Sequence, residues 1–214
     1  MHPRLIELLE YLDAQRASVL GAASSLPPER WIERPDVDRW SVSEVCWHLQ
    51  RVETGVAKLI RKRANEARLQ GHPAEDADSS LLGSLDGRRL DDRSVRLVAP
   101  SQITPTEMPS AEMVQQQLNE SREMLRAAVA DADGLALGSI THPHPVLGEI
   151  DLYQWILFVG HHEARHAQQI DEVAQSVDAI EVDARSPRVI EHARLPHASR
   201  LPARAGEDVT HGVW

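Results

Sequence analysis

The sequence contains the hexapeptide His161-His162-Glu163-Ala164-Arg165-His166, in which two histidines stand four residues apart. On a helix, His162 and His166 lie on one face about one turn apart, so both imidazoles can reach the same ion. His161 is turned about 100° away from His162 and is expected at the edge of the helix. Two histidines buried in an apolar core without partners are unfavourable, and a divalent metal ion satisfies both. The spacing therefore predicts two metal ligands.

His48 is the best candidate for a third ligand. It lies three residues after Val45 and four before Val52, so it borders the apolar face of another predicted helix. Three neutral imidazoles leave coordination positions open, as in catalytic sites. They suit zinc or nickel and offer too little anionic oxygen for magnesium or calcium. The alternative interpretation is that these histidines are structural and hydrogen-bond to neighbouring groups.

Glu163 is the candidate catalytic carboxylate, and two roles remain open for it. The pattern from His162 to His166 is H-E-x-x-H, the zinc-peptidase signature, in which the glutamate activates a metal-bound water. Against a peptidase, Gln169 stands where the longer metzincin pattern needs glycine. Inside a helical bundle, Glu163 could instead take a proton or orient a ligand histidine from behind. An ordinary helix carboxylate bonded to a neighbouring polar side chain is the alternative.

Three further residues invite a chemical role. Cys46 lies about 160° around its helix from His48, so we interpret it as a core residue rather than a nucleophile. Trp40 and Trp155 either line a substrate pocket near the metal or serve packing alone, and the sequence leaves both interpretations open.

Composition excludes several classes of protein. Lys and Arg number 23 against 33 for Asp and Glu, and this net charge of −10 argues against nucleic acid or an anionic membrane as the main partner. We find no apolar run long enough to span a bilayer and no secretory signal at the start. The single cysteine excludes an intrachain disulfide and a multi-cysteine metal site. We therefore expect a cytoplasmic protein that acts on a small molecule.

Four segments show the three- and four-residue spacing of apolar residues that is typical of amphipathic helices. They are residues 4–25, 41–63, 110–130 and 151–177. Ser41 and Glu44 form a capping box at the start of the second helix, and Ser110 caps the third. Residues 72–109 carry scattered prolines and glycines, which predict a long crossover connection. Residues 141–145 should be extended because prolines follow two of them.

These elements predict an all-α protein, a four-helix bundle with a long crossover connection between its second and third helices. Residues 1–177 form the bundle in this interpretation. Residues 178–214 carry prolines among scattered charges and are expected to form a loosely structured C-terminal extension. Within that extension, only residues 180–190 could add a short ordered piece.

Two stretches of the sequence resemble one known family. Residues 40–49, Trp-Ser-Val-Ser-Glu-Val-Cys-Trp-His-Leu, resemble the W-S-x-x-E-x-x-x-H-L opening of the second helix in the DinB-like (YfiT-like) metalloenzymes. Residues 144–150 look like the P-x-x-G turn of the same family. Residues 162–170 look like its metal helix, H-[DE]-x-x-H-x-x-Q-I. The resemblance covers roughly residues 1–177.

The resemblance implies a crossover four-helix bundle with a divalent metal on His48, His162 and His166, often in a homodimer. The family includes transferases and isomerases that use a low-molecular-weight thiol such as glutathione, bacillithiol or mycothiol. A dication lowers the pKa of a thiol bound to it, so a thiolate forms at neutral pH and can attack an electrophile. The resemblance thus implies a thiol-dependent S-transferase or a related activity. The alternative is a metal-binding bundle protein that catalyses nothing.

Overall fold

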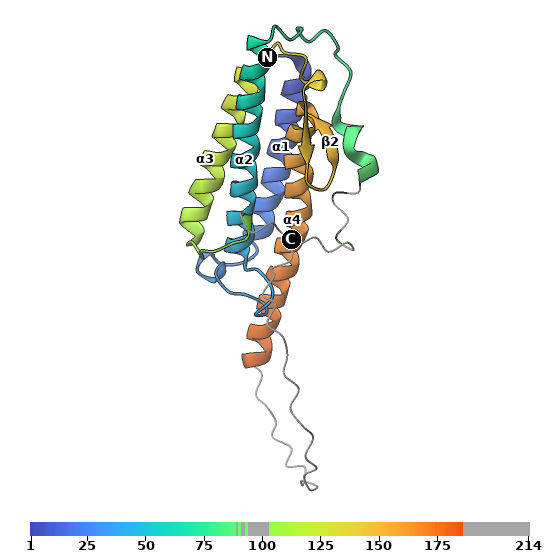
Figure 1. Ribbon diagram of the computed structural model, residues 1–214. Coiled ribbons are helices and arrows are strands. Elements are labelled where there is room, and N and C mark those ends of the chain that lie inside the picture. Colours follow the sequence, from blue (N-terminus) through green and yellow to red (C-terminus); the bar gives the residue numbers. More distant parts are fainter. Residues whose placement is uncertain (89, 91–92, 94–102, 186–214) are drawn as a thin grey trace, which may run out of the picture.

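The computed structural model describes residues 1–88, 90, 93 and 103–185. Four long helices run side by side as a bundle (Figure 1): α1 (Pro3–Ala23), α2 (Val42–Leu69), α3 (Ala111–Asp131) and α4 (Leu152–Arg185). Helix α1 packs against α4, and α2 packs against both α3 and α4. The predicted four-helix bundle, with its long connection between α2 and α3, is confirmed. None of the described helices combines the length and the apolar character that crossing a membrane requires.

Hydrogen-bonding side chains fix the starts of α2 and α3, as predicted. The Ser41 hydroxyl accepts from the backbone N–H of Glu44 at 3.2 Å, and the Glu44 carboxylate accepts from the backbone N–H of Ser41 at 2.9 Å. The Ser110 hydroxyl accepts from the backbone N–H of Met113 at 3.3 Å. These bonds satisfy backbone donors that the first turn of a helix leaves unpaired.

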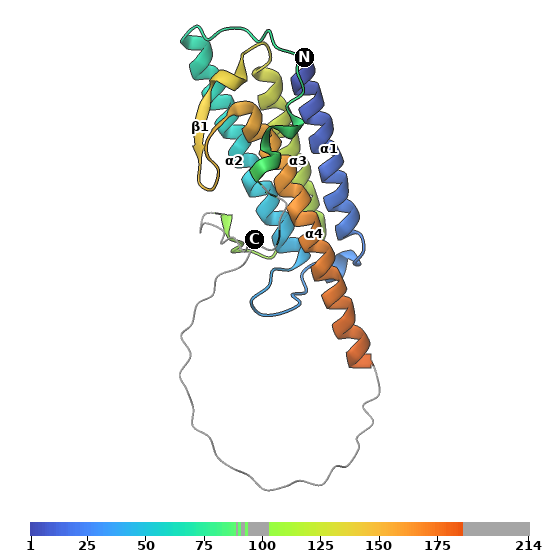
Figure 2. The same cartoon turned by 90° about the vertical axis from the view of Figure 1, so that its right-hand side faces the viewer.

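Two helices extend further than their apolar pattern predicts. Helix α2 continues to Leu69, because alanines of its last turns are buried and their small side chains give a weak pattern. Helix α4 continues to Arg185, past the predicted end at residue 177, and projects beyond the other helices (Figure 2). The Arg30 guanidinium donates to the carboxylate of Asp178 at 2.7 Å and holds this part of α4 to the bundle. The rest of the predicted extension, residues 186–214, lies outside the described residues.

The connection between α2 and α3 contains a short 3-10 helix, η2 (Leu82–Arg88), that the sequence pattern does not predict. Leu85 of η2 is buried against the core. Earlier in the connection, the Glu75 carboxylate accepts from Arg4 at 3.1 Å and from the Tyr153 hydroxyl at 2.7 Å. The described part of the connection is thus fastened to α1 and α4.

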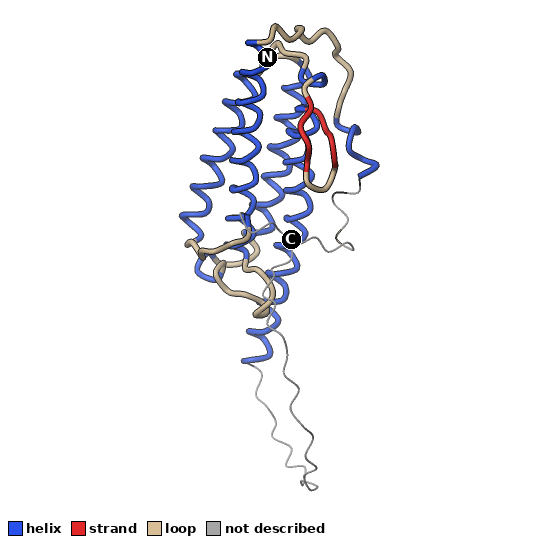
Figure 3. Tube along the Cα trace, viewed as in Figure 1, coloured by secondary structure: helices blue, strands red, loops and turns tan. Residues whose placement is uncertain are grey.

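A β-hairpin precedes α4, after the 3-10 helix η4 (Leu137–Ser139). Its strands β1 (Thr141–His144) and β2 (Gly148–Asp151) pair antiparallel, with His144 opposite Gly148. The hairpin is drawn in red in Figure 3 and lies beside the first half of α4. The backbone of Gly148 turns with φ 72°, which glycine adopts without strain. The extended conformation of β1 is confirmed, whereas its pairing with β2 was not predicted.

A layer of polar side chains divides the apolar core of the bundle into two parts. One part gathers residues from the start of α1, the second half of α2, the end of α3 and the start of α4. The other gathers residues from the opposite ends of the same helices, together with Trp31 of the segment after the 3-10 helix η1 (Pro28–Arg30). Between them every helix contributes buried polar groups: Arg16, His48, Glu53, Ser121, Arg122, His162, Glu163 and His166.

Candidate metal centre

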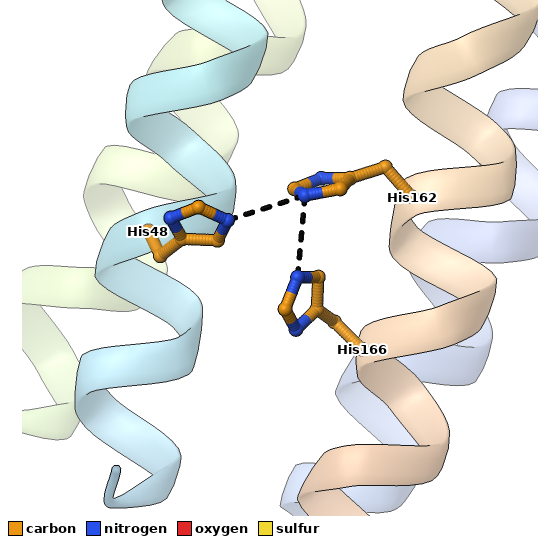
Figure 4. A group of neighbouring side chains, drawn as sticks. All are labelled: His48, His162 and His166. Carbon is orange, nitrogen blue, oxygen red and sulfur yellow. Dashed lines mark hydrogen bonds between the residues drawn. The ribbon is translucent and has the colours of Figure 1, made fainter. Parts of the chain in front are cut away.

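Helices α2 and α4 bring three histidines together in the polar layer. His48 points from α2 toward His162 and His166 of α4 (Figure 4). The Nε2 atom of His162 lies 3.2 Å from Nε2 of His48 and 3.2 Å from Nε2 of His166. All three side chains are buried. The structure thus brings together the three residues predicted as ligands, which we call the histidine cluster.

Hydrogen bonds behind the cluster orient two of its rings. The Nδ1 atom of His48 lies 2.8 Å from the carbonyl oxygen of Ile103, and Nδ1 of His166 lies 2.8 Å from Oε1 of Gln169. Since an amide oxygen only accepts, each Nδ1 carries the hydrogen of its ring. Each Nε2 then presents a lone pair toward His162. Arg93 donates to the same Gln169 oxygen at 3.4 Å, so a residue of the crossover connection supports this arrangement.

Hydrogen bonds among the three rings cannot account for both short contacts. A neutral His162 can donate from Nε2 to only one of its two neighbours. At least one of the two 3.2 Å contacts therefore brings two nitrogens close together in a buried site without a hydrogen bond between them. Such a contact is unfavourable unless a cation lies between the nitrogens. The donor set therefore fits a metal ion and is poorly explained by hydrogen bonding among the three rings.

The spacing of the nitrogens also suits a small divalent ion. Two nitrogens that bind one tetrahedral ion at about 2.0–2.1 Å lie about 3.3–3.4 Å apart. The observed separations of 3.2 Å are close to this value, and all three ligand atoms lie within 4.8 Å of one another. The buried cluster of His48, His162 and His166 could therefore hold a metal ion, with three protein ligands and an open fourth position.

Burial keeps the three imidazoles neutral. It lowers the pKa of His48 to about 4, although the bond to the Ile103 carbonyl raises it in part. Burial lowers the pKa of His162 and His166 well below the usual value, and the neighbouring histidines of the cluster add to this effect. Neutral imidazole is the form that binds metals. At neutral pH an incoming ion thus displaces no proton from these ligands.

Glu163 lies next to His162 in the sequence but belongs to a different set of contacts. Its Oε1 atom accepts from Arg16 at 2.7 Å and its Oε2 atom accepts from Arg122 at 2.9 Å. The same two guanidinium groups donate to Glu53, each at 2.6 Å. We call Arg16, Glu53, Arg122 and Glu163 the charge cluster. With both oxygens of Glu163 bound to arginines, the geometry does not favour it as the base for a metal-bound water.

The charge cluster is not among the predicted sites, although the sequence carries a signal for it. Arg16, Glu53 and Arg122 each follow a leucine by four residues and precede another buried apolar residue by three. A charged residue within an apolar stripe is expected to be buried and paired. The same spacing on three helices therefore indicates one shared layer. Burial alone would lower the pKa of Arg122, but the carboxylates of Glu163 and Glu53 outweigh this effect and raise it above the usual value.

The structure also places the other three candidates, Cys46, Trp155 and Trp40. Cys46 is buried, and burial raises the pKa of its thiol to about 12, which agrees with a core residue rather than a nucleophile. Trp155 lines a cavity of about 440 Å³ beside the cluster, and its indole N–H donates to the carbonyl oxygen of His142 at 3.1 Å. Trp40 is buried with its ring 5.2 Å from that of His48.

Comparison with known proteins assigns the chain to a family. The sequence profile described as the DinB superfamily matches residues 11–170. The chain belongs to the DinB superfamily. The matched residues include all three histidines of the cluster, so the candidate metal centre lies inside the part of the chain that the family profile covers.

Two further similarities agree with this assignment. The chain is 29% identical over 154 residues to YuaE, an uncharacterized protein of Bacillus subtilis (strain 168), across 72% of this chain and 88% of YuaE. It also resembles the crystal structure of TT2238, a four-helix bundle protein, with a TM-score of 0.51 and 22% identity. That similarity covers 77% of this chain and 94% of TT2238. At this identity the likeness to TT2238 supports the fold of the DinB protein and nothing more.

Proposed function

We propose that this DinB protein is a metal-dependent enzyme that uses a low-molecular-weight thiol, with S-transfer to an electrophilic small molecule as its activity. The observation that carries the proposal is the convergence of three neutral imidazoles, in which the Nε2 lone pairs of His48 and His166 are directed at Nε2 of His162. Zinc or nickel are the ions that suit three imidazoles in a buried site. Three protein ligands leave one position for an exogenous ligand, which is typical of catalytic rather than structural sites.

A bound divalent ion would lower the pKa of a thiol that coordinates it and so supply a thiolate at neutral pH. The residues of the chain hold and shield the site. Ile103 and Gln169 fix the rings of His48 and His166 through their Nδ1 atoms. Such bonds behind the ligands typically strengthen metal binding by one to two orders of magnitude. Trp40, packed against His48, keeps water from that side of the ring.

Metal content is the first test. We expect about one zinc or nickel ion per chain in protein purified without added metal, as measured by elemental analysis. His166→Ala should lose this metal, because two imidazoles hold a divalent ion far more weakly than three. His161→Ala is the matched control, since it removes a histidine from the same helix without touching the cluster, and it should keep the metal. Protein that binds no divalent ion at micromolar concentrations would contradict the proposal.

Thiol binding is the second test. Cobalt-substituted protein is mixed separately with glutathione, bacillithiol and mycothiol while its absorption spectrum is recorded. We expect one thiol to produce a thiolate-to-cobalt charge-transfer band, followed by turnover when an electrophile is added. A protein that binds metal but gives no band with any thiol would instead support the alternative function, a metal-binding bundle protein without catalysis. The expected homodimer can be measured on the same preparation by light scattering.

The peptidase alternative predicts a different result. In that reading Glu163 is the general base, so Glu163→Gln should abolish hydrolysis of denatured casein while the metal stays bound. The two arginine contacts of Glu163 argue against this role. We therefore expect no cleavage of casein by the metal-loaded protein. Thiol-dependent activity, by contrast, should fall about ten- to a hundredfold in Glu163→Gln, because the residue supports the helix that carries the ligands.

A further inference from the structure

The cavity beside the histidine cluster has a lining with few polar groups. It measures about 440 Å³, within the range of small-molecule sites, and lies between α2, the β-hairpin and the start of α4. Apolar side chains make up most of its wall, among them Val56, Leu59, Val146 and Phe158. Arg51 also lines it, but this side chain is exposed and its guanidinium lies 5.5 Å from the ring of Trp47, at the edge of the cavity.

The wall of the cavity is shared with the histidine cluster. The ring of Phe158 lies 5.3 Å from that of His162. Ile103 also lines the cavity, and its carbonyl oxygen holds Nδ1 of His48. A molecule in the cavity therefore lies one side chain away from the predicted metal ligands.

The wall also contains His144, whose ring orientation is fixed by hydrogen bonds to the backbone. Its Nδ1 atom accepts from the backbone N–H of Val146 at 3.1 Å and from that of Leu147 at 3.2 Å. A nitrogen that accepts carries no hydrogen, so the hydrogen of the neutral ring is on Nε2. The ring packs 4.8 Å from that of Trp155 and 4.4 Å from that of Phe158, which holds it in place.

The Nε2–H group of His144 is an available donor. Burial lowers the pKa of His144 to about 4, so the ring is neutral at physiological pH. Among the residues that the structure describes, no acceptor is bonded to Nε2. The side chain is mostly buried in the cavity wall, and a ligand oxygen in the cavity would accept from this group in place of water. Because the donor is neutral and its surroundings are apolar, an uncharged carbonyl oxygen suits it better than a carboxylate.

From this geometry we propose that the cavity binds a conjugated carbonyl compound with an aromatic or branched apolar body, and that the Nε2–H of His144 donates to its carbonyl oxygen. This substrate class rests on the proposed function for its chemistry. When a thiol adds to such a compound, a bond forms between sulfur and the β-carbon, and the C=C π electrons move toward the carbonyl oxygen. The thiol proton ends on the α-carbon. A donor already aimed at that oxygen stabilises the charge that develops there.

The test uses binding to metal-free protein without a thiol, so its outcome is independent of the proposed enzymatic activity. Isotope-labelled protein is titrated with benzylideneacetone, and with the matched hydrocarbon in which a C=CH2 group replaces the carbonyl. Amide signals of Val146 and Leu147 and the indole signal of Trp155 report on the cavity. We expect the ketone to bind about three- to tenfold more tightly than the hydrocarbon, as one neutral hydrogen bond allows.

Two variants test whether His144 causes the preference for the ketone over the hydrocarbon. His144→Phe keeps an aromatic ring but removes the donor, so both probes should bind with equal affinity. His142→Phe is the matched control, because His142 also lines the cavity on the same strand, and it should keep the preference of the wild type. A preference that survives in His144→Phe would overturn the proposal. So would the absence of any signal change at the cavity with either probe.

Wild-type protein provides a measurement that needs no variant. The 15N chemical shifts of the His144 ring should show hydrogen on Nε2 and none on Nδ1, and the opposite tautomer would overturn the proposal. Signals of the cavity that shift with protein concentration alone would place a second chain there and overturn it as well. If ketone binding is as expected while no thiol binds the metal-loaded protein, the cavity assignment stands and the proposed S-transfer fails.

Discussion

The polar layer of the bundle contains two buried clusters of side chains, which differ in how their hydrogen-bond donors and acceptors are paired. In the charge cluster two arginines and two glutamates balance in charge, and every carboxylate oxygen accepts at least one hydrogen bond. In the histidine cluster the rings are neutral, and the Nε2 lone pairs of His48 and His166 are both directed at Nε2 of His162. The clusters approach each other on α4, where His162 and Glu163 are consecutive residues.

The difference between the charge cluster and the histidine cluster shows how a structural polar cluster can be distinguished from a binding site. Burial of polar groups alone does not make the distinction, since both clusters are buried. The pairing of donors with acceptors does, because a cluster in which they match needs no further ligand, whereas converging imidazole nitrogens that cannot all bond one another suit a cation. For the same reason, removal of one member should affect the two clusters differently: it should destabilise the fold in the first and abolish ligand binding in the second.

The largest effect is expected from breaking the charge cluster. Arg122→Met removes a guanidinium that donates to both Glu53 and Glu163, and it leaves buried carboxylates without their partner. Loss of one partner from a buried ion pair typically lowers the free energy of unfolding by about 3–5 kcal/mol. Urea unfolding of the metal-free protein measures this loss. Arg126→Met is the control, because its pair with Asp13 is exposed and should contribute less than about 1 kcal/mol.

Metal removal tests the other cluster. With free zinc at about 100 times its dissociation constant, the metal should raise the free energy of unfolding by about 2.7 kcal/mol. A chelator should remove this gain from the wild-type protein. His48→Ala should show no gain at all, although its metal-free stability also falls, because the variant loses the bond to the Ile103 carbonyl and leaves a buried cavity. Full zinc affinity in His48→Ala would remove this residue from the site.

A smaller effect is expected where α4 approaches α1 closely. A Cβ atom on Gly160 would lie 2.3 Å from Cε1 of Tyr11, so alanine at this position must push the two helices or the Tyr11 ring apart. We expect Gly160→Ala to lower the free energy of unfolding by about 1–2 kcal/mol, as overpacking does. Gly21→Ala is the control, since a Cβ there meets open space and alanine favours helix. Equal stability of the two variants would contradict the close packing.

The smallest effect is expected in the pH dependence of stability, which tests whether His144 is buried and neutral. Burial gives His144 a pKa of about 4 in the folded chain, against about 6.5 for an unfolded one. Between these values the unfolded chain binds a proton that the folded chain does not, so stability is complete above pH 6.5 and falls as the pH drops toward 4. His144→Phe should lower this slope by about 1.4 kcal/mol per pH unit. Identical slopes from pH 6.5 to 5 in metal-free wild type and variant would contradict a buried neutral His144.

The sequence predicts most of the fold because apolar periodicity and helix caps are local signals. The four helices, the capping box at Ser41 and the extended strand β1 all follow from patterns within a few residues. What could not be predicted depends on distant partners. Asp178, just past the predicted end of α4, is bound by Arg30, which is far away in the chain, and η2 buries Leu85 against other elements. The pairing of the hairpin strands likewise needs a register that the short strands do not encode clearly.

The same division between local and distant information applies to the site. The spacing of His162 and His166 is local and predicts a shared face, and His48 follows from its place on the second apolar stripe. The partners that fix the rings, Ile103 and Gln169, depend on how the crossover connection and α4 pack. The role of Glu163 depends on arginines contributed by two other helices. A motif of five residues therefore identified the ligands but not the surroundings that assign a role to each.

The close succession of unrelated contacts along α4 has an evolutionary consequence. From Gly160 to His166, neighbouring positions serve the α1 contact, the histidine cluster and the charge cluster in turn. One inserted or deleted residue would rotate everything beyond it by about 100° and exchange the partners of every later side chain. Descendants of this chain can thus exchange one side chain for another along this stretch but cannot change its length. A change of length in the connection between α2 and α3 rotates no helix, so it should be tolerated more easily wherever it spares the contacts of Glu75, Leu85 and Ile103.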